Sequence, residues 1–223
     1  LAVALVKLSS AAASDTECAC AVKDPHIALA HGGHADLRGK DHALYNLVSA
    51  PDVSVNAMTQ DSVLKLGELT VHGSFITQLH FTLRTISGKS FRLSHDASMM
   101  NFEQWNFDMG SATCGDDVLL LGPKVAKECD DLSAKVGLST LTVTTKHWRF
   151  KVAGQPVYGR LAGPHHRLDF YIEALVDEAA LNAHGIIGQS FDGSLIPRQG
   201  RMDHYPPTDI PADFYTSAMA EGA

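Results

Sequence analysis

Four histidines near the start of the chain are the first residues whose types and spacing could do chemistry. They are His26, His31, His34 and His42, and two glycines between His31 and His34 give a flexible turn that could bring two imidazoles together. Imidazole nitrogens bind transition metals such as zinc and copper. The same pattern is typical of a polar turn with solvated histidines, and this is the interpretation that we favour.

The common catalytic motifs do not occur in the sequence. The segment 188–193 reads G-Q-S-F-D-G, which is not the G-x-S-x-G of a nucleophile elbow. The zinc-protease motif H-E-x-x-H and the phosphate-binding glycine motifs are also missing. The acidic pairs Asp116-Asp117 and Asp130-Asp131 are more typical of solvated loop charges than of a glycosidase pair. The sequence therefore predicts a protein that is not an enzyme. The alternative is a hydrolase on a β scaffold that uses histidine and aspartate clusters.

Apolar and polar residues alternate with period two along much of the chain, which predicts β-strands. Segments 140–144, 147–152 and 168–174 show the alternation. In segment 75–85, one face would carry Phe75, Thr77, Leu79, Phe81 and Leu83. Turn signals such as Ala50-Pro51-Asp52 and Ser87-Gly88-Lys89 separate the apolar runs. The recurrence of short strands and turns predicts a mainly β protein, an antiparallel β-sandwich.

The remaining segments predict few helices and irregular ends. We expect one or two short helices, at 177–183 and 125–132. Residues 1–17 contain an apolar run and a small-residue stretch, typical of a signal-peptide remnant or of a flexible arm. Residues 18–205 form the expected β domain, and residues 206–223 form a Pro-rich, irregular and truncated tail.

Composition and charge exclude several classes of partner. The chain has 223 residues and a formal net charge of −7, which disfavours nonspecific binding to nucleic acid. A basic stripe with aromatic residues, as a nucleic-acid binder needs, does not occur. No apolar run approaches the ~18 residues of a transmembrane segment. The oligomeric state stays open at this point.

Four cysteines, Cys18, Cys20, Cys114 and Cys129, are the residues that could form disulfides. An even count beside a signal-like segment favours disulfides and a secreted protein. Cys18 and Cys20 lie about 6.5 Å apart along an extended strand, which disfavours a bridge between them. One option pairs Cys114 with Cys129, a short loop worth ~3 kcal/mol in the chain-entropy model. The other pairs Cys18 and Cys20 with Cys114 and Cys129.

Three segments carry a resemblance to a known family. They are Asp24-Pro25-His26 followed by Gly32, Asp36 and Gly39, the strand-like segments at 70–72 and 75–83, and Gly185-Ile186-Ile187-Gly188-Gln189-Ser190-Phe191-Asp192-Gly193. Together they resemble the von Willebrand factor type D module, which usually reads G-D-P-H, then T-F-D-G, and later G-L-C-G-N-F-N-G. The segment 184–189 is also similar to the C-terminal part of inter-α-trypsin inhibitor heavy chains and to plant root-cap-type proteins.

The resemblance implies a secreted, non-catalytic module of extracellular matrix, cell wall or cell surface that contacts protein or polysaccharide. It also implies a calcium site at Gln189, Asp192 and Asp203, since calcium takes several oxygen ligands; a plain Asp-Gly turn at 192–193 is the alternative. Some family members break the Asp-Pro bond autocatalytically, which would here occur at Asp24-Pro25. The alternative there is that Asp24 and His26 fix the first strand through hydrogen bonds.

The chain departs from the family pattern at four positions. Lys23 stands where the family has glycine, and His31 replaces the aspartate of T-F-D-G. Ile187 replaces the cysteine of G-L-C-G, and Asp41 lies near the place of an early cysteine. With cysteine missing from both places, the covalent multimerisation known for mucin-like members is not expected here.

Overall fold

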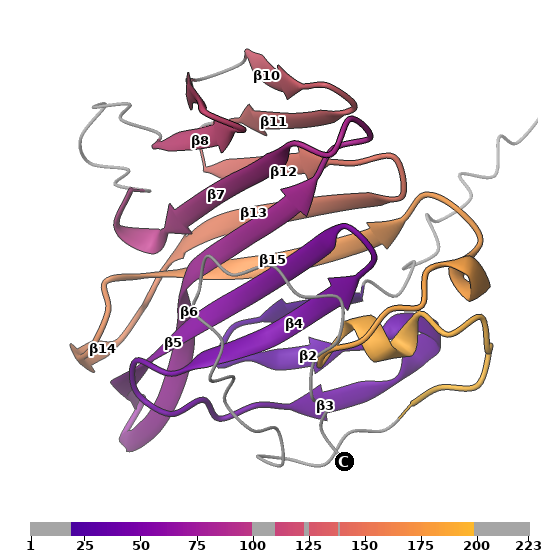
Figure 1. The fold of residues 1–223 in the computed structure, drawn as a ribbon. Helices are drawn as coiled ribbons and strands as arrows, with labels where there is room; N and C mark the ends of the chain where they lie inside the picture. Colours follow the sequence, from indigo (N-terminus) through magenta and orange to yellow (C-terminus); the bar gives the residue numbers. More distant parts are fainter. Residues whose placement is uncertain (1–18, 100–109, 123–124, 138, 199–223) are drawn as a thin grey trace, which may run out of the picture.

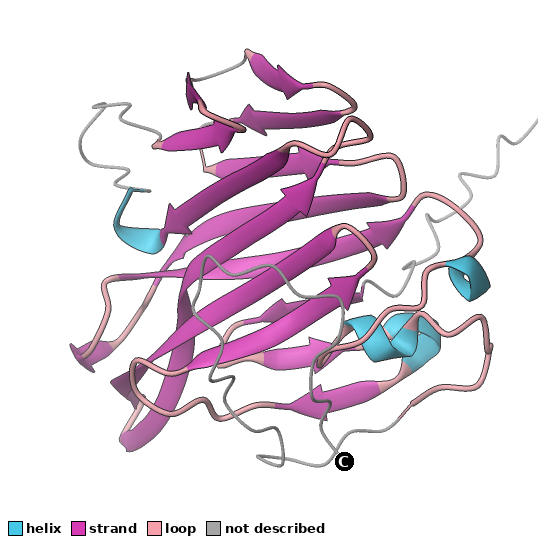
Figure 2. Cartoon of the chain, viewed as in Figure 1, coloured by secondary structure: helices cyan, strands magenta, loops and turns pink. Residues whose placement is uncertain are grey.

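Two antiparallel β-sheets face each other across a shared core (Figures 1 and 2). The structure is a computed structural model, and it describes residues 19–99, 110–122, 125–137 and 139–198. The predicted antiparallel β-sandwich is therefore confirmed. Residues 1–18 and 199–223 lie outside the described residues. The expected segments 1–17 and 206–223 fall there, and so do Cys18 and Asp203. In the part of the chain that is described, no helix is long and apolar enough to cross a membrane.

The first sheet has eight strands. Its order is β10 (Ala126–Cys129), β11 (Leu132–Val136), β12 (Thr140–Thr144), β13 (Trp148–Pro156), β15 (His166–Ala174), β1 (Ala19–Val22), β2 (His26–Ala28) and β3 (His34–Asp36). The long pair β13 and β15 forms its centre, with Phe150 opposite Ile172 and Val152 opposite Phe170. The alternation in the sequence places these apolar residues on the inner face, as predicted.

The second sheet is built around one long hairpin. Its order is β14 (Arg160–Ala162), β5 (Val53–Leu66), β6 (Leu69–Arg84), β7 (Ser90–Asp96), β8 (Ser111–Cys114) and β9 (Asp117–Leu120). Strand β4 (Leu44–Ala50) pairs with the first half of β5, from Val53 to Met58, and β14 pairs with its second half. The predicted turn at Ser87-Gly88-Lys89 joins β6 to β7.

One part of the predicted strand pattern, the inward position of Phe75, is wrong because the pairing of β5 and β6 contains a bulge. The register between β5 and β6 shifts beside Met58, so that Gln78 pairs with Met58 and Ile76 with Thr59. Because a shift of one residue exchanges the two faces of a strand, Ile76 enters the main core in place of Phe75. Phe75 instead packs in a small separate cluster with Leu64 and Val157.

The described helical segments are four short 3-10 turns: η1 (Ala30–Gly32), η2 (Ala97–Met99), η3 (Glu178–Ala180) and η4 (Gly188–Ser190). The helix expected at 177–183 appears as η3, where the Asp177 side chain accepts a hydrogen bond from the Ala179 amide. The helix expected at 125–132 is wrong, because β10 and β11 pair there and Cys129 lies opposite Leu132.

Aromatic side chains from both sheets meet in the core. Phe81 of β6 lies 5.8 Å, between ring centroids, from Phe150 of β13, and Phe150 stacks on Phe170 of β15. Trp148 meets Phe191 edge-on at 5.1 Å. Such pairs add about 0.5 to 1.5 kcal/mol beyond the area that they bury. Phe191 thereby fastens the segment after η4 to the end of the sandwich.

One disulfide links the two sheets. Cys114 of β8 is bonded to Cys129 of β10, with the two Cα atoms 5.8 Å apart. This bond excludes the pairing of Cys18 and Cys20 with Cys114 and Cys129. Cys20 is also disulfide-bonded. The disulfides predicted from the even cysteine count are therefore present for every described cysteine.

Candidate functional site

The Asp24-Pro25-His26 turn places a histidine between two carboxylates. Strands β2 and β3 pair so that His26 lies opposite Asp36, and His26 Nδ1 is 2.8 Å from Asp36 Oδ1. On the other side of the ring, Nε2 is 3.2 Å from Asp24 Oδ1. These contacts agree with the interpretation in which Asp24 and His26 fix the first strand. Cleavage at Asp24-Pro25 stays a prediction.

Lys23 adopts a backbone conformation that favours glycine. Its φ is 61°, which lies in the left-handed region that costs an L-residue roughly 1 to 2 kcal/mol. Its amide donates a hydrogen bond to Asp169 Oδ1 of β15, so the turn is anchored to the centre of the first sheet. The geometry explains why a glycine would suit this position.

The four early histidines have different environments. His31 Nε2 lies 2.7 Å from Glu178 Oε2 of η3, and His42 Nε2 lies 3.7 Å from Asp41 Oδ2. Within the described ranges, no three His, Cys, Asp or Glu side chains gather closely enough to hold a metal ion. The histidines thus act singly as partners of nearby carboxylates, apart from His34, which is exposed on β3.

The glycine-rich segment from Gly185 docks along β4 through its backbone. The His184 and Ser49 backbones exchange two hydrogen bonds, and the Ile186 amide donates to the Asn46 carbonyl. Gly185 has a φ of 90°, and a Cβ there would lie 2.4 Å from Asn46 Oδ1. Only glycine fits so close to β4. Ile187, the residue in place of a family cysteine, is completely buried.

Two other predicted glycines also lie against neighbouring strands. A Cβ at Gly39 would lie 2.2 Å from Thr59 Oγ1, and the Gly39 amide donates to Ser74 Oγ. At Gly188 a Cβ would make ordinary contact with Val48 at 3.4 Å. Gly39 is thus a packing requirement, whereas Gly188 has room for a small side chain.

The predicted calcium ligands Gln189 and Asp192 face an arginine. Asp192 Oδ2 is 2.9 Å from Arg198 Nη2, its Oδ1 accepts the Ser194 amide, and Gln189 Oε1 lies 3.5 Å from Arg198 Nη1. The Ser194 hydrogen bond, followed by the Arg198 guanidinium, lowers the pKa of Asp192. The described residues thus supply two oxygen-bearing side chains of the predicted set, and both contact the Arg198 guanidinium.

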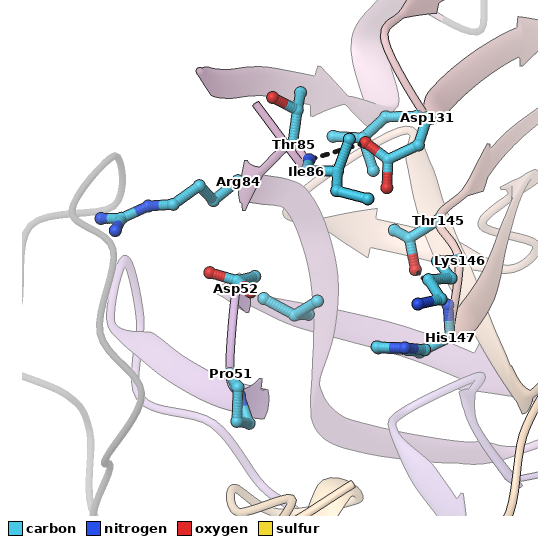
Figure 3. Close-up of a pocket in the computed structure, with 11 residues that line it drawn as sticks. Pro51, Asp52, Arg84, Thr85, Ile86, Asp131, Thr145, Lys146 and His147 are labelled. Atoms are coloured by element: carbon cyan, nitrogen blue, oxygen red, sulfur yellow. Dashed lines mark hydrogen bonds between the residues drawn. The ribbon is translucent and has the colours of Figure 1, made fainter. Parts of the chain in front are cut away.

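A pocket of about 170 Å³ at one end of the sandwich was not predicted from the sequence (Figure 3). Four turns from both sheets form its walls. The lining residues are Pro51, Asp52, Val53, Arg84, Thr85, Ile86, Asp131, Leu132, Thr145, Lys146 and His147. In Figure 3 the Arg84 side chain runs away from the hollow, whereas Asp52 and Asp131 lie around it with Lys146 and His147. Of these four turns, the sequence predicted those at Ala50-Pro51-Asp52 and Ser87-Gly88-Lys89, and it did not show that the four meet.

The turn at Asp130-Asp131 holds the two sheets together beside this pocket. Ser87 Oγ donates a hydrogen bond to Asp130 Oδ2, and Lys89 Nζ lies 3.0 Å from Asp130 Oδ1. The Ile86 amide donates to Asp131 Oδ1 at 2.9 Å. The hydrogen bond from Ser87, with smaller contributions from Lys89 and Thr85, lowers the pKa of Asp130 to about 2. Both residues are exposed in the turn between β10 and β11, as expected of solvated loop charges, and they also clamp the β6–β7 turn.

A second pocket, of about 180 Å³, adjoins the first. It shares Pro51, Asp52 and His147 with it, and its other lining residues are Ala50, Trp148, Val176, Ala180 and Leu181. A third pocket, of about 220 Å³, is lined by His42, Met58, Gln60, Thr77, Gln78, Asp96, Ala97, Ser98, Pro164, His165 and His166. In that pocket both Asp96 carboxylate oxygens accept hydrogen bonds, Oδ2 from the Gln78 side-chain amide and Oδ1 from the Ser98 hydroxyl.

His95 of β7 is a histidine buried in the core. It is 2% exposed, and among the described residues neither ring nitrogen has a hydrogen-bond partner. Burial lowers its pKa from 6.5 to about 4, opposed in part by the charge of Asp96. The alternation along β7, which puts His95 on the same buried face as Phe91 and Leu93, is the signal in the sequence that could have found it.

Comparison with known proteins adds no assignment. No family model matches the chain, and no curated protein matches it.

Proposed function

We propose that the protein is a secreted, non-catalytic β-sandwich module that resembles von Willebrand factor type D domains. It would serve assembly in extracellular matrix, cell wall or cell surface through contacts with protein or polysaccharide. The observation that carries the proposal is the Cys114–Cys129 disulfide between the two sheets, because disulfides form and persist mainly in oxidising compartments.

The backbone supports the family part of the proposal at the positions that carry the resemblance. Lys23, in the place of the family glycine, has a positive φ. Gly185 has a positive φ and no room for a Cβ. Ile187 fills the core where the family has a cysteine, so an apolar side chain substitutes there for a sulfur.

The hydrogen bonds of the predicted motifs support a non-catalytic role. His26 is held by Asp24 and Asp36, and Asp192 is held by Arg198. Each of these groups stabilises a turn in which its own motif lies. Their polar atoms therefore contribute to the architecture of the domain.

Localisation and thiol state test this proposal. Cells that produce the native protein are fractionated, and free thiols are alkylated before reduction and mass spectrometry. We expect the protein in the medium or the cell-wall fraction, with Cys114 and Cys129 unlabelled. Native protein in the cytosol with both thiols alkylated would overturn the proposal.

Calcium binding is a separate part of the proposal. Calcium would bind Gln189, Asp192 and Asp203 and would have to displace Arg198 from Asp192. An Arg198→Gln variant keeps a polar side chain and removes the competing charge, so calorimetric titration with calcium chloride should show tighter binding than in the wild type. Absence of binding heat in both proteins would remove calcium from the proposal.

The pocket in Figure 3 favours a hydrolase as the second candidate function. It gathers His147, Asp52 and Asp131 in one concave site, and such a site is where a general acid or base would be sought. Chromogenic esters and glycosides test this candidate, with His147→Ala as the inactive variant. Turnover that persists in the variant, or no turnover at all, would eliminate it.

A further inference from the structure

Two pockets adjoin each other at the end of the sandwich. They share Pro51, Asp52 and His147, so the shared residues separate two hollows that lie side by side. Their volumes of about 170 and 180 Å³ lie below the range of roughly 300 to 1,000 Å³ typical of drug-sized ligands. Each hollow therefore suits one small ring, and the pair suits a chain of linked rings.

The charges that line the first pocket are balanced. Asp52 and Asp131 supply two negative charges to its lining, Arg84 and Lys146 supply two positive ones, and His147 adds an imidazole. A purely anionic ligand would meet the two carboxylates, and a purely cationic ligand would meet the ammonium group. A neutral ligand with many hydroxyl groups has no such conflict, because each hydroxyl both donates and accepts hydrogen bonds.

Backbone groups of the turn at 145–148 beside the pocket are already hydrogen-bonded within the protein. The Thr145 amide donates to the Trp148 carbonyl, and the Leu175 amide donates to the His147 carbonyl. The His147 and Trp148 amides both donate to Thr145 Oγ1. A peptide that binds by adding a strand needs free backbone partners. A ligand recognised by side chains alone is therefore favoured.

Apolar side chains beside these polar groups give the rings a surface to pack on. Ile86 is 78% exposed in the first pocket, and Val176 is 39% exposed in the second. Pro51 lies in the wall between them. The combination of charged hydrogen-bonding groups and exposed aliphatic surface suits a sugar ring, which has polar edges and apolar C–H faces.

We propose that this groove binds two consecutive units of a neutral polysaccharide, one unit in each pocket. The proposal deepens the extracellular role proposed above and rests on it for the setting in which such a polymer occurs. Binding is measured with purified protein in solution, so its failure can be told apart from a failure of secretion.

Calorimetry and saturation-transfer NMR with cellotetraose, mannotetraose and tetra-N-acetylchitotetraose test the proposal. A glucuronate-containing tetrasaccharide and tetra-alanine serve as anionic and zwitterionic comparators. We expect one neutral tetrasaccharide to bind with a Kd near or below about 1 mM, and more tightly than its monosaccharide.

Variants with unchanged folding locate the site. His147→Ala removes a side chain shared by both pockets and should weaken binding about tenfold or more, the effect of one lost hydrogen bond. The matched control is His72→Ala, an exposed histidine on β6, which should bind like the wild type. Val176→Ser should weaken the tetrasaccharide and leave the monosaccharide unaffected.

Several results would overturn the proposal. They are no binding of any neutral tetrasaccharide, equal affinity in the wild type and His147→Ala, or stronger binding of the anionic comparator. Binding of tetra-alanine that is lost in His147→Ala would instead assign the groove to peptides.

Discussion

Asp130, in the turn between β10 and β11, accepts a hydrogen bond from Ser87, in the turn between β6 and β7. The two residues belong to different sheets, and the bond lies one residue from Cys129, whose disulfide also joins the sheets. A covalent and a charged link therefore fasten the same end of the sandwich. The first pocket opens directly beside them.

Loss of the Asp130 charge should weaken the acid resistance of the fold. The folded pKa of Asp130 is about 2, below the usual 3.8, so its stabilisation is present above pH 4 and is lost as the pH falls through 2. Asp130→Asn keeps a side chain that tolerates the φ of 52°. It should lower the Tm at pH 5 and flatten the dependence of Tm on pH between 4 and 2. Asp117→Asn on β9 is the control, and equal profiles for the two variants would contradict the clamp.

Replacement of His95 by leucine should stabilise the protein, mostly at acidic pH. The folded pKa is about 4 and the unfolded value 6.5, so the unfolded state takes up a proton first and stability falls as the pH drops from 6.5 to 4. The loss amounts to about 3 kcal/mol. Urea unfolding of His95→Leu should show this dependence removed. A pH profile like that of the wild type would mean that a hydrogen-bond partner stabilises the charged His95 in solution. The control is His72→Leu, at an exposed histidine.

Gly185→Ala should destabilise the fold more than a matched change in an open turn. At Gly185 the positive φ and the contact with Asn46 act together, whereas a Cβ at Gly67, with a φ of 60°, meets nothing within 4 Å. We expect a loss of about 3 kcal/mol for Gly185→Ala and of about 1 kcal/mol for Gly67→Ala. Chemical denaturation of both variants measures the difference. Equal losses would show that the docking of the segment on β4 is looser than described.

Lys23→Gly should stabilise the turn before β2. The change relieves the left-handed strain of Lys23 and keeps the amide that donates to Asp169, for a gain of about 1 kcal/mol. Lys65→Gly, in the regular strand β5, should instead destabilise by a similar amount. Thermal and urea unfolding distinguish the two, and a destabilised Lys23→Gly would show that the lysine side chain has a role of its own.

Removal of the Cys114–Cys129 disulfide should lower stability without changing the fold. The bond closes a loop with a sequence separation of 15, which corresponds to about 3 kcal/mol in the chain-entropy model. A Cys114→Ala and Cys129→Ala double variant should lose about this amount in urea unfolding, with an unchanged circular dichroism spectrum. A loss below about 1 kcal/mol would mean that the Asp130 clamp alone holds this end.

Strand positions could be predicted from the sequence because apolar alternation is a local signal. The alternation around Phe150 and Phe170 predicts β13 and β15 as strands, whereas the pairing of the two strands was not predicted. The position of Phe75 was predicted wrongly because a bulge shifts the strand register by one residue, and no pattern in the sequence indicates the bulge. The helix signal at 125–132 is weak, and the segment instead forms the paired strands β10 and β11, with Cys129 opposite Leu132. This pairing is supported by the neighbouring strand β12.

The candidate site was less predictable than the fold. The motif at Asp24-Pro25-His26 is contiguous, so its contacts with Asp36 follow from one hairpin. The pocket beside His147 is assembled from four turns that are far apart in the sequence, and only the packing of the two sheets brings them together. The disulfide pairing also depended on that packing.

The covalent link between β8 and β10 also sets how the domain would respond to mechanical load. When the two ends of the chain are pulled apart, the loop closed by Cys114 and Cys129 cannot lengthen. A stretch of 15 residues, roughly 50 Å of extended chain, stays out of the extension. Under tension, strands β8 to β10 would therefore stay tethered to each other after the rest of the sandwich had unravelled.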